Sequence, residues 1–445
     1  MSDESVLPFL SKFDPPQQSE GSLDPLGLYS IADALGVRLA PGIRERQTTP
    51  RFLTLALVGM VACGEVNSSS SDSNELPPWL VYEWLIVESL VRELRKKPEQ
   101  LQGIPGREKV LATIDTNDVV CARNYLKTPS VFGFHGIYRV LGVKAGLFDV
   151  EGHPLDFGYR ILSAWQAEQG LAGFLDGNGP GRDLRRSFEK AVRKGLNVGH
   201  GPDLGSEARH LIAEHLHPRK SGPKESDALW SALTHNDAMR GEYALKLIST
   251  DGQDAWHQAS GSEAAYHAWL IAHVSPSMTQ LLTTIRSYER LARLLTDAFD
   301  EIRWTMTEER QPVSVEKLGL GPAVIRASKE FLTAYADAVV QLGEIDPGLR
   351  MRAERSFVRL GEANSPTSFA ARLLDHHASI QKAKPPNGKR AWFDLFGDER
   401  VAIRPAYTVS GFAPSPEAYV HTYRCQPLTS FARQLGRVSL EQGAS

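Results

Sequence analysis

Cysteine is scarce in this sequence, whose 445 residues include only Cys63, Cys121 and Cys425. None of the three lies in a C-x-x-C pair, so the sequence predicts neither a disulfide framework nor a cysteine-rich zinc site. Few and isolated cysteines are typical of a reducing compartment, and we therefore expect the protein to be cytoplasmic.

Excess charge of either sign is also missing. The formal net charge is −3 at pH 7, which provides no general attraction to nucleic acid or to a membrane surface. Any binding site for a polyanion must therefore be a local basic patch. With 42% hydrophobic and 23% charged residues, the composition is that of a globular protein. Its length predicts roughly two to four domains.

No hydrophobic run is long enough to cross a membrane. The N-terminus, MSDESVLPFL, lacks a basic region followed by an apolar one, so we predict no signal peptide. The most apolar window runs from Phe52 to Cys63, whereas a membrane-spanning helix needs about 20 residues. We expect this window to form a buried core helix.

Catalytic and metal-binding patterns are absent as well. The sequence has no G-x-S-x-G nucleophile elbow, no H-E-x-x-H and no nucleotide-binding P-loop. His376 and His377 are adjacent, so on a helix they point about 100° apart and do not readily share one ion. We predict a protein without catalysis of its own, without a cofactor and without a metal, although an enzyme with an unrecognised site stays a third alternative.

Hydrophobic periodicity predicts a mainly α fold. The predicted helices include 77–96, 117–127, 275–306, 321–342, 347–360 and 365–382. Because short loops join the later helices, we expect an antiparallel helical bundle over residues 201–382. The prolines and aromatic residues of 383–445, with a strand-like piece from Val401 to Tyr407, predict a small irregular or α+β C-terminal cap.

Three further segments precede the bundle. Residues 1–23 are polar and rich in proline and glutamine, and we expect a flexible arm. Residues 24–115 are predicted to form an N-terminal helical domain. Residues 116–200 are predicted to contain a winged-helix-like unit that is followed by a basic helix.

The winged-helix prediction comes from residues 127–169. An amphipathic segment ends at Gly142, a strand-like piece follows at 147–150, Glu151-Gly152 can form a tight turn, and a second amphipathic helix begins near Asp156. Helix, hairpin and helix in this order are typical of winged helix-turn-helix domains, and also of protein-binding modules that bind no DNA. Asp149, Glu151 and Asp156 would repel phosphate, which leaves both alternatives open.

A first basic stretch follows the glycine-rich loop 177–181. Between Arg182 and Lys194 there are six basic residues and two acidic ones. Glycines let the backbone approach an anion, and we expect the first free amides of the helix to point at it. The alternative is a loop followed by a solvated helix face. The candidate phosphate-binding residues here are Arg182, Arg185, Arg186, Lys190, Arg193 and Lys194.

A second basic stretch lies between the last bundle helix and the cap. No acidic residue interrupts residues 382–390, and Trp392 and Phe393 follow after Ala391. Cations interleaved with aromatic rings suit a polyanion that has stackable bases, whereas the alternative is a flexible basic loop. The candidate residues are Lys382, Lys384, Lys389, Arg390 and Trp392.

These segments together carry a resemblance. The stretch FHGIYRVLGVKAGLFDVEGHPLDFGYRILSAW is similar to winged-helix segments. Combined with GNGPGRDLRRSF and KPPNGKRAWF, it resembles accessory proteins that accompany helicases, methyltransferases and nucleases in bacterial antiviral-defence operons. The resemblance covers about a third of the chain.

The resemblance implies a non-catalytic subunit of a bacterial defence or DNA-processing complex. Such a subunit would recognise nucleic acid, with DNA favoured over RNA, or would serve as a scaffold for partner proteins. The alternative function is an adaptor that binds a partner enzyme without contacting nucleic acid. No membrane partner is expected.

Overall fold

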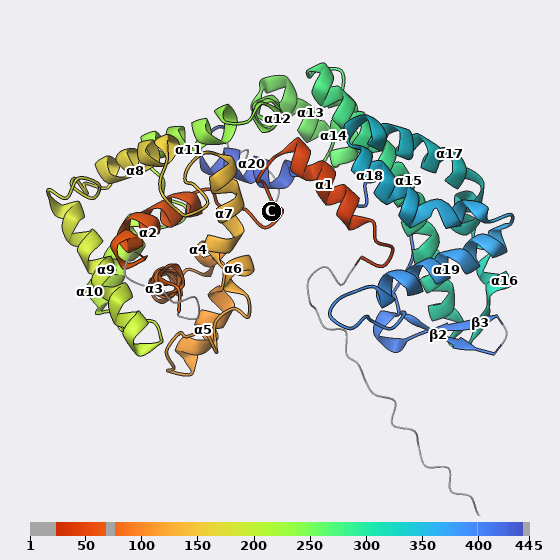
Figure 1. Cartoon of the computed structure of the whole chain (residues 1–445), viewed down its shortest axis with the longest axis horizontal. Helices are drawn as coiled ribbons and strands as arrows, with labels where there is room; N and C mark the ends of the chain where they lie inside the picture. The colour runs from red at the N-terminus through yellow and green to blue at the C-terminus, as the bar shows by residue number, and fades with distance from the viewer. Residues whose placement is uncertain (1–23, 68–75, 398, 439–445) are drawn as a thin grey trace, which may run out of the picture. The chain divides into compact units, whose positions relative to one another are not determined.

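A computed structural model describes residues 24–67, 76–397 and 399–438 (Figure 1). The prediction of a mainly α fold is confirmed, and the described residues also form a small antiparallel sheet. The elements are α1 (Tyr29–Leu39), α2 (Phe52–Asn67), α3 (Pro78–Leu94), α4 (Pro98–Leu101), α5 (Arg107–Asp115), α6 (Pro129–Phe132), α7 (Phe134–Lys144), α8 (Asp156–Glu168), α9 (Pro180–Val198), α10 (Ser206–His215), α11 (Pro223–His235), α12 (Ala238–Ile248), α13 (Thr250–Gln258), α14 (Glu263–Leu270), α15 (Pro276–Glu309), β1 (Val313–Ser314), α16 (Val315–Leu318), α17 (Pro322–Ile345), α18 (Pro347–Phe357), the 3-10 helix η1 (Val358–Glu362), α19 (Pro366–Lys382), β2 (Phe393–Phe396), β3 (Arg400–Ile403), the 3-10 helix η2 (Pro405–Tyr407) and α20 (Cys425–Gln434).

The described chain divides into two compact units. Unit 1 contains residues 24–35 and 261–421, and unit 2 contains residues 36–260 and 422–438. Each unit therefore combines segments that are far apart in the sequence. The domain boundaries predicted at residues 115, 200 and 382 separate parts of the chain that would fold independently. The two compact units do not test independent folding, so these boundaries stay predictions.

The core of unit 2 is built around α2. Residues 52–58 of this helix are at most 4% exposed, so the prediction of a buried core helix is confirmed. Helices α3 and α9 pack against α2, and α10 packs against α3. Within the described residues, no helix combines the length and apolar character that spanning a bilayer requires.

A buried ion pair joins distant segments of unit 2. Arg51 immediately precedes α2 and donates from Nε and Nη2 to the two carboxylate oxygens of Glu225 in α11, at 2.9 and 3.0 Å. Its remaining donors bind the carbonyl groups of His215 and His217 at the end of α10. Both charged side chains are at most 1% exposed. The bidentate geometry satisfies the guanidinium where water cannot.

Unit 1 is built on two long antiparallel helices, α15 and α17 (Figure 1). Gln280 near the start of α15 donates to Gln341 near the end of α17 at 3.1 Å, whereas Asp297 further along α15 accepts from Arg326 near the start of α17 at 3.0 Å. Pairing that runs in opposite directions establishes the antiparallel packing. Helices α18 and α19 pack against α17, as expected for a helical bundle.

Most predicted helices are observed, but one is wrong. The predictions at 77–96, 275–306, 321–342, 347–360 and 365–382 correspond to α3, α15, α17, α18 with η1, and α19. Residues 117–127 instead form turns. There the Asn124 side chain accepts from the backbone N–H of Cys121 and donates to the carbonyl of Val119. Side chains of this kind compete with helical hydrogen bonds, which accounts for the difference.

The C-terminal segment contributes to both units. In unit 1, β3 pairs with β1 and with β2 to form a three-stranded antiparallel sheet in the order β1-β3-β2. The strand-like piece predicted at 401–407 is a strand only as far as Ile403. In unit 2, α20 packs against α12. The predicted cap therefore holds both strand and helix, as expected, in two separate places.

The buried ion pair makes a prediction about stability. Replacing Arg51 with methionine leaves Glu225 buried without a partner, so the free energy of unfolding of unit 2 should fall by about 3–5 kcal/mol. Hydrogen exchange of the α2 amides measures this change locally. The double variant Arg51→Met, Glu225→Leu should lose less than the sum of the two single variants. Strictly additive losses would show that the two side chains do not act as a pair.

Candidate nucleic-acid interface

A helix, a short hairpin and a second helix follow one another in unit 2, in the predicted order. Helix α7 leads into a hairpin in which Phe148 and Pro154 form a single antiparallel bridge. The backbone N–H of Leu155 donates to the carbonyl of Leu147 at 2.8 Å, and α8 begins at the next residue. The hairpin is therefore very short.

The tip of this hairpin is acidic. Ligand atoms of Asp149, Glu151 and His153 lie within 4.8 Å of one another, a spacing that one cation could bridge. The backbone N–H of His153 donates to Asp149 and lowers the pKa of its carboxyl group, which is therefore ionised at neutral pH. A negative hairpin tip disfavours the approach of a phosphate backbone.

The beginning of α7 is capped by a buried carboxyl group from α3. Glu83 is fully buried and accepts hydrogen bonds from the backbone N–H of His135 at 2.9 Å and from the Tyr125 hydroxyl at 2.8 Å. Burial raises the pKa of Glu83 to about 7, although both hydrogen bonds act in the opposite direction. The position of α7 is thus tied to a titratable group.

A small cavity of about 170 Å³ lies beside this cap. Its lining includes Trp79, His135, Arg139 and Glu151. The His135 and Trp79 rings stack with their centroids 4.6 Å apart, and burial lowers the pKa of His135 to about 4. The imidazole is therefore neutral at pH 7 and packs as an aromatic side chain.

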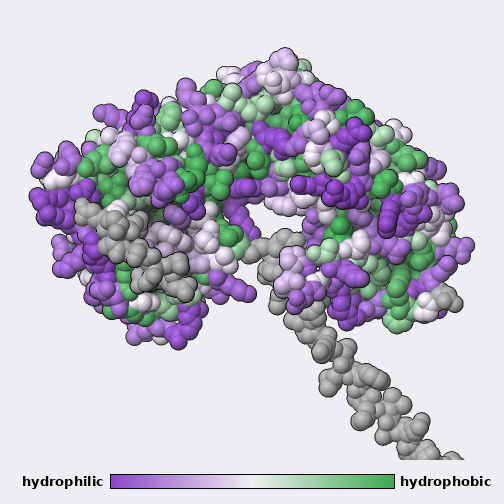
Figure 2. All heavy atoms as spheres, in the orientation of Figure 1, coloured by the Kyte–Doolittle hydropathy of each residue, from purple (hydrophilic) through white to green (hydrophobic). Residues whose placement is uncertain are grey.

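Helix α9 is amphipathic, with a cationic outer face. Phe188 and Val192 are buried on the side of the helix that packs against α2 and α3. At 100° per residue, four cations elsewhere on the helix fall within about 80° of arc. This basic stripe consists of Arg182, Arg186, Lys190 and Arg193. The region where Figure 1 draws α9 and α10 carries a hydrophilic edge in Figure 2.

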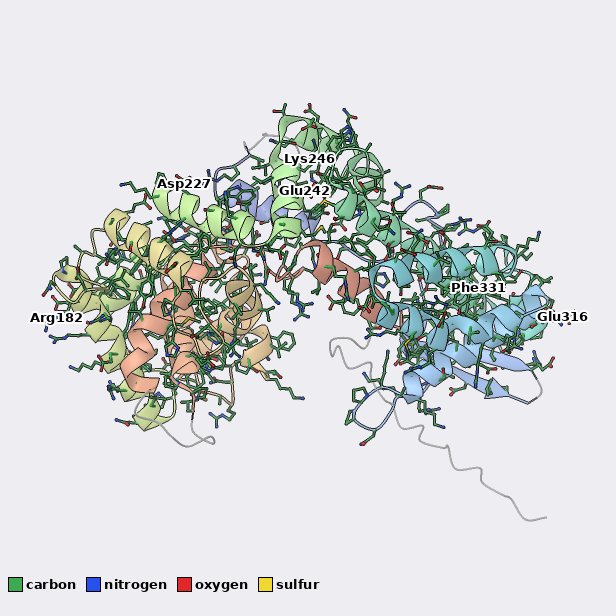
Figure 3. The ribbon with its side chains drawn as sticks, turned by 45° about the horizontal axis from the view of Figure 1, so that its top comes forward. Arg182, Asp227, Glu242, Lys246, Glu316 and Phe331 are labelled. Atoms are coloured by element: carbon green, nitrogen blue, oxygen red, sulfur yellow. The ribbon has the colours of Figure 1, made fainter. Side chains whose placement is uncertain are left out.

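The predicted cations of α9 differ in what they contact. Among the described residues, no ion pair is recorded for Arg182, Arg186, Lys190 or Lys194. Figure 3 labels Arg182 at the outer edge of unit 2. Arg193 pairs with Glu189 one turn earlier at 2.9 Å, and both side chains keep access to solvent.

Arg185 has a structural role. Its Nη1 donates to the carbonyl of Phe174 at 3.1 Å and also approaches the carbonyl of Leu175 at 3.4 Å. The guanidinium thus contacts the backbone just before the glycine-rich loop 177–181. Because this contact engages only Nη1 of a half-buried side chain, phosphate binding by Arg185 stays a prediction.

The glycine-rich loop does not leave the first helical amides open. Pro180 has no N–H group, Gly181 donates to the carbonyl of Ala172 at 2.9 Å, and Arg182 donates to that of Gly179 at 3.0 Å. The prediction that these amides point at an anion is wrong, because the loop folds back over the helix start. In this part of the chain, the groups available to an anion are therefore the side chains of the basic stripe and not the amides at the start of α9.

The second basic stretch lies in unit 1, where its cations are also unequal. Lys382 is exposed, whereas Lys384 is half-buried and donates to the carbonyl of Asp24 at 2.9 Å. Burial lowers the pKa of Lys384. Arg390 pairs with Asp394 at 2.8 Å, and Lys389 is half-buried. The stretch therefore presents less free charge than its sequence suggests.

Trp392 does not present an open ring. Its side chain is 6% exposed, and it stacks on Tyr407 with the ring centroids 4.8 Å apart and the planes at 5°. The guanidinium carbon of Arg303 lies 4.9 Å from the ring centroid. Protein groups therefore pack against the Trp392 ring in this structure, and base stacking by Trp392 stays a prediction.

The neighbouring histidines complete the packing around Trp392. His377 donates from Nδ1 to the carbonyl of Pro25 at 2.9 Å and accepts at Nε2 from the backbone N–H of Trp392 at 3.1 Å. Burial lowers the pKa of His377 to about 4, consistent with this neutral tautomer. His376 binds the carbonyl of Leu26. Both rings therefore anchor the segment that precedes α1.

Sequence reasoning missed two features of unit 2. Glu83 lies inside an otherwise apolar stretch of α3, and a lone carboxyl group at a core position is the signal that marks it. A larger cavity between α9 and α10 is the second feature. It arises from packing between helices, for which no local pattern exists.

Titration of Glu83 gives a prediction. The pKa of Glu83 is about 7 in the folded protein, against 4.5 for a glutamate in the unfolded chain. Between pH 4.5 and 7 the folded state therefore binds more protons than the unfolded state. The stability that Glu83 contributes is therefore largest at low pH and is lost as the pH rises towards 7. Replacing Glu83 with glutamine should remove this loss, so the variant gains on the wild type by up to about 1.4 kcal/mol per pH unit.

Chemical denaturation of both proteins at pH 5, 6, 7 and 8 measures this difference. His135 titrates in both proteins, so its contribution cancels in the comparison. A difference in unfolding free energy that stays constant over the series would contradict the assignment.

Comparisons of the chain with protein-family models, with curated proteins and with solved structures found no match. The functional interpretation therefore depends on the geometry of the two units themselves.

Proposed function

We propose that the chain is a non-catalytic, nucleic-acid-binding or scaffolding subunit of a bacterial defence or DNA-processing complex. The observation that carries the proposal is the basic stripe of α9. Three of its cations, Arg182, Arg186 and Lys190, have no recorded ion pair within the described residues and lie at successive turns of one helix. Cations spaced in this way can contact successive phosphates, and each contact releases counterions.

The neighbouring helices favour the same assignment. Helices α7 and α8 with the hairpin between them form a proposed winged-helix-like unit, and α9 is the next helix, connected to α8 by residues 169–179. Because Asp149 and Glu151 make the hairpin tip negative, we propose that α9 contacts the backbone in place of the hairpin. The contacts would then be largely independent of base sequence.

The loop 382–390 is a second, weaker candidate surface. We propose that Lys382, Lys389 and Arg390 contribute charge there, without Lys384 and without Trp392. Because this loop belongs to unit 1 and α9 to unit 2, each surface is treated separately.

A charge-removal experiment tests the basic stripe. The variant Arg182→Gln, Arg186→Gln, Lys190→Gln should bind a DNA duplex more weakly. The slope of log affinity against log salt concentration should fall by about one for each lost phosphate contact. Fluorescence anisotropy over a salt series measures both quantities, and RNA and single-stranded DNA of the same length compare the classes of nucleic acid.

A matched control removes the same charge from unit 1. Lys329, Arg355 and Arg359 are exposed, and replacing them with glutamine changes the net charge by the same amount. The control should keep the wild-type affinity and slope. If both variants lose the same affinity and slope, the effect is one of net charge alone. If the stripe variant keeps the wild-type affinity and slope, α9 is not part of the interface.

One observation favours the second candidate function, a protein-interaction adaptor. Leu332 and Val340 of α17 are 60% and 58% exposed, and their spacing of eight residues places them on one helix face. Large exposed apolar side chains on one face are typical of protein-binding surfaces. Recovery of a stoichiometric partner that Leu332→Ser, Val340→Ser abolishes, without any binding to nucleic acid, would favour this function over the first.

A further inference from the structure

The cavity between α9 and α10 has a volume of about 460 Å³. Both helices pack against α3, and the cavity lies between them. The volume lies in the range of roughly 300–1,000 Å³ that is typical of small-molecule sites. It is formed entirely within unit 2.

The walls of the cavity are mostly apolar. Helix α9 contributes Leu184 and Ala191, which lie on the side of the helix away from the basic stripe. Helix α10 contributes Ala208 and Leu211, and Leu211 is 40% exposed. When an apolar molecule enters the cavity, it displaces water from this apolar surface, which makes the free energy of binding more favourable.

Hydrogen-bonding groups meet where α10 ends. The Nδ1 of His215 lies 3.3 Å from the Oε1 of Gln169, and both residues line the cavity. Burial lowers the pKa of His215, so the ring is neutral at pH 7. This pair can exchange hydrogen bonds with one polar group of a ligand.

The charges around the cavity select against an anion. The lining residues include Asp183 but neither lysine nor arginine. The nearby guanidinium of Arg51, which binds the carbonyl of His215, is neutralised by its bidentate contact with Glu225. A carboxylate or phosphate in the cavity would therefore lack a counter-ion and would be repelled by Asp183.

We propose that this cavity binds a neutral amphiphile, a molecule with an alkyl or ring body and one hydroxyl, carbonyl or amide group. The body lies between α9 and α10, and the polar group lies at His215 and Gln169. The assignment is independent of nucleic-acid binding, because the cavity and the basic stripe occupy different sides of α9.

The full-length chain can be tested with two probes. The neutral dye N-phenyl-1-naphthylamine, which fluoresces in apolar surroundings, should bind saturably with one molecule per chain, and 1-decanol should displace it. Decanoate has the same chain length but carries a charge, and it should displace the dye at least about tenfold more weakly. Binding that does not saturate, or equal displacement by decanol and decanoate, would overturn the proposal.

Two variants locate the site. Ala208→Trp fills the cavity and should weaken dye binding by at least about tenfold, whereas Ala112→Trp adds the same side chain to an exposed position of α5 and should not. Leu211→Asn makes the half-open wall polar and should also weaken binding, and it decides the matter if Ala208→Trp fails to fold. Wild-type dye affinity in Leu211→Asn and in a folded Ala208→Trp variant would place the dye elsewhere and overturn the proposal.

Discussion

The buried pair of Arg51 and Glu225 is the interaction on which unit 2 depends. It joins the start of α2, the end of α10 and the start of α11, which are more than 150 residues apart at the extremes. Helix α9 packs against α2, and His215 lines the cavity between α9 and α10. The guanidinium therefore connects the start of α2, the helix on which α9 packs, to His215, which lines the cavity. Loss of either partner leaves the other charge buried and uncompensated, which is strongly destabilising.

Much of the helical architecture could be predicted because its signals are local. Ser275 followed by Pro276 begins α15, and apolar residues then recur at helical spacing until the helix ends. The turn at Asn124 was missed because side-chain hydrogen bonds there outweigh a weak helical pattern. The sequence also could not predict that residues 24–35 belong to unit 1. Their position depends on contacts with residues some 350 positions away, such as those of His376 and His377.

For the candidate interface, too, local features could be predicted from the sequence and long-range contacts could not. The basic character of α9 is a property of composition and spacing, so the sequence predicted it. The separate roles of Arg185, Lys384 and Trp392 depend on carbonyl groups and rings that folding brings to them. Charge counted along a sequence therefore overestimates the charge that a surface presents. On α9 the four cations of the basic stripe lie along one face of the helix.

The most direct test of the basic stripe is a chemical footprint of lysine side chains in the full-length chain. Acetylation with a limiting reagent, followed by peptide mass analysis, measures the reactivity of each amine with and without a DNA duplex. We expect Lys190, and to a smaller extent Lys194 at the border of the stripe, to lose reactivity when duplex is added, while the exposed Lys329 of unit 1 does not. Unchanged reactivity of Lys190 in the presence of bound duplex would contradict this expectation.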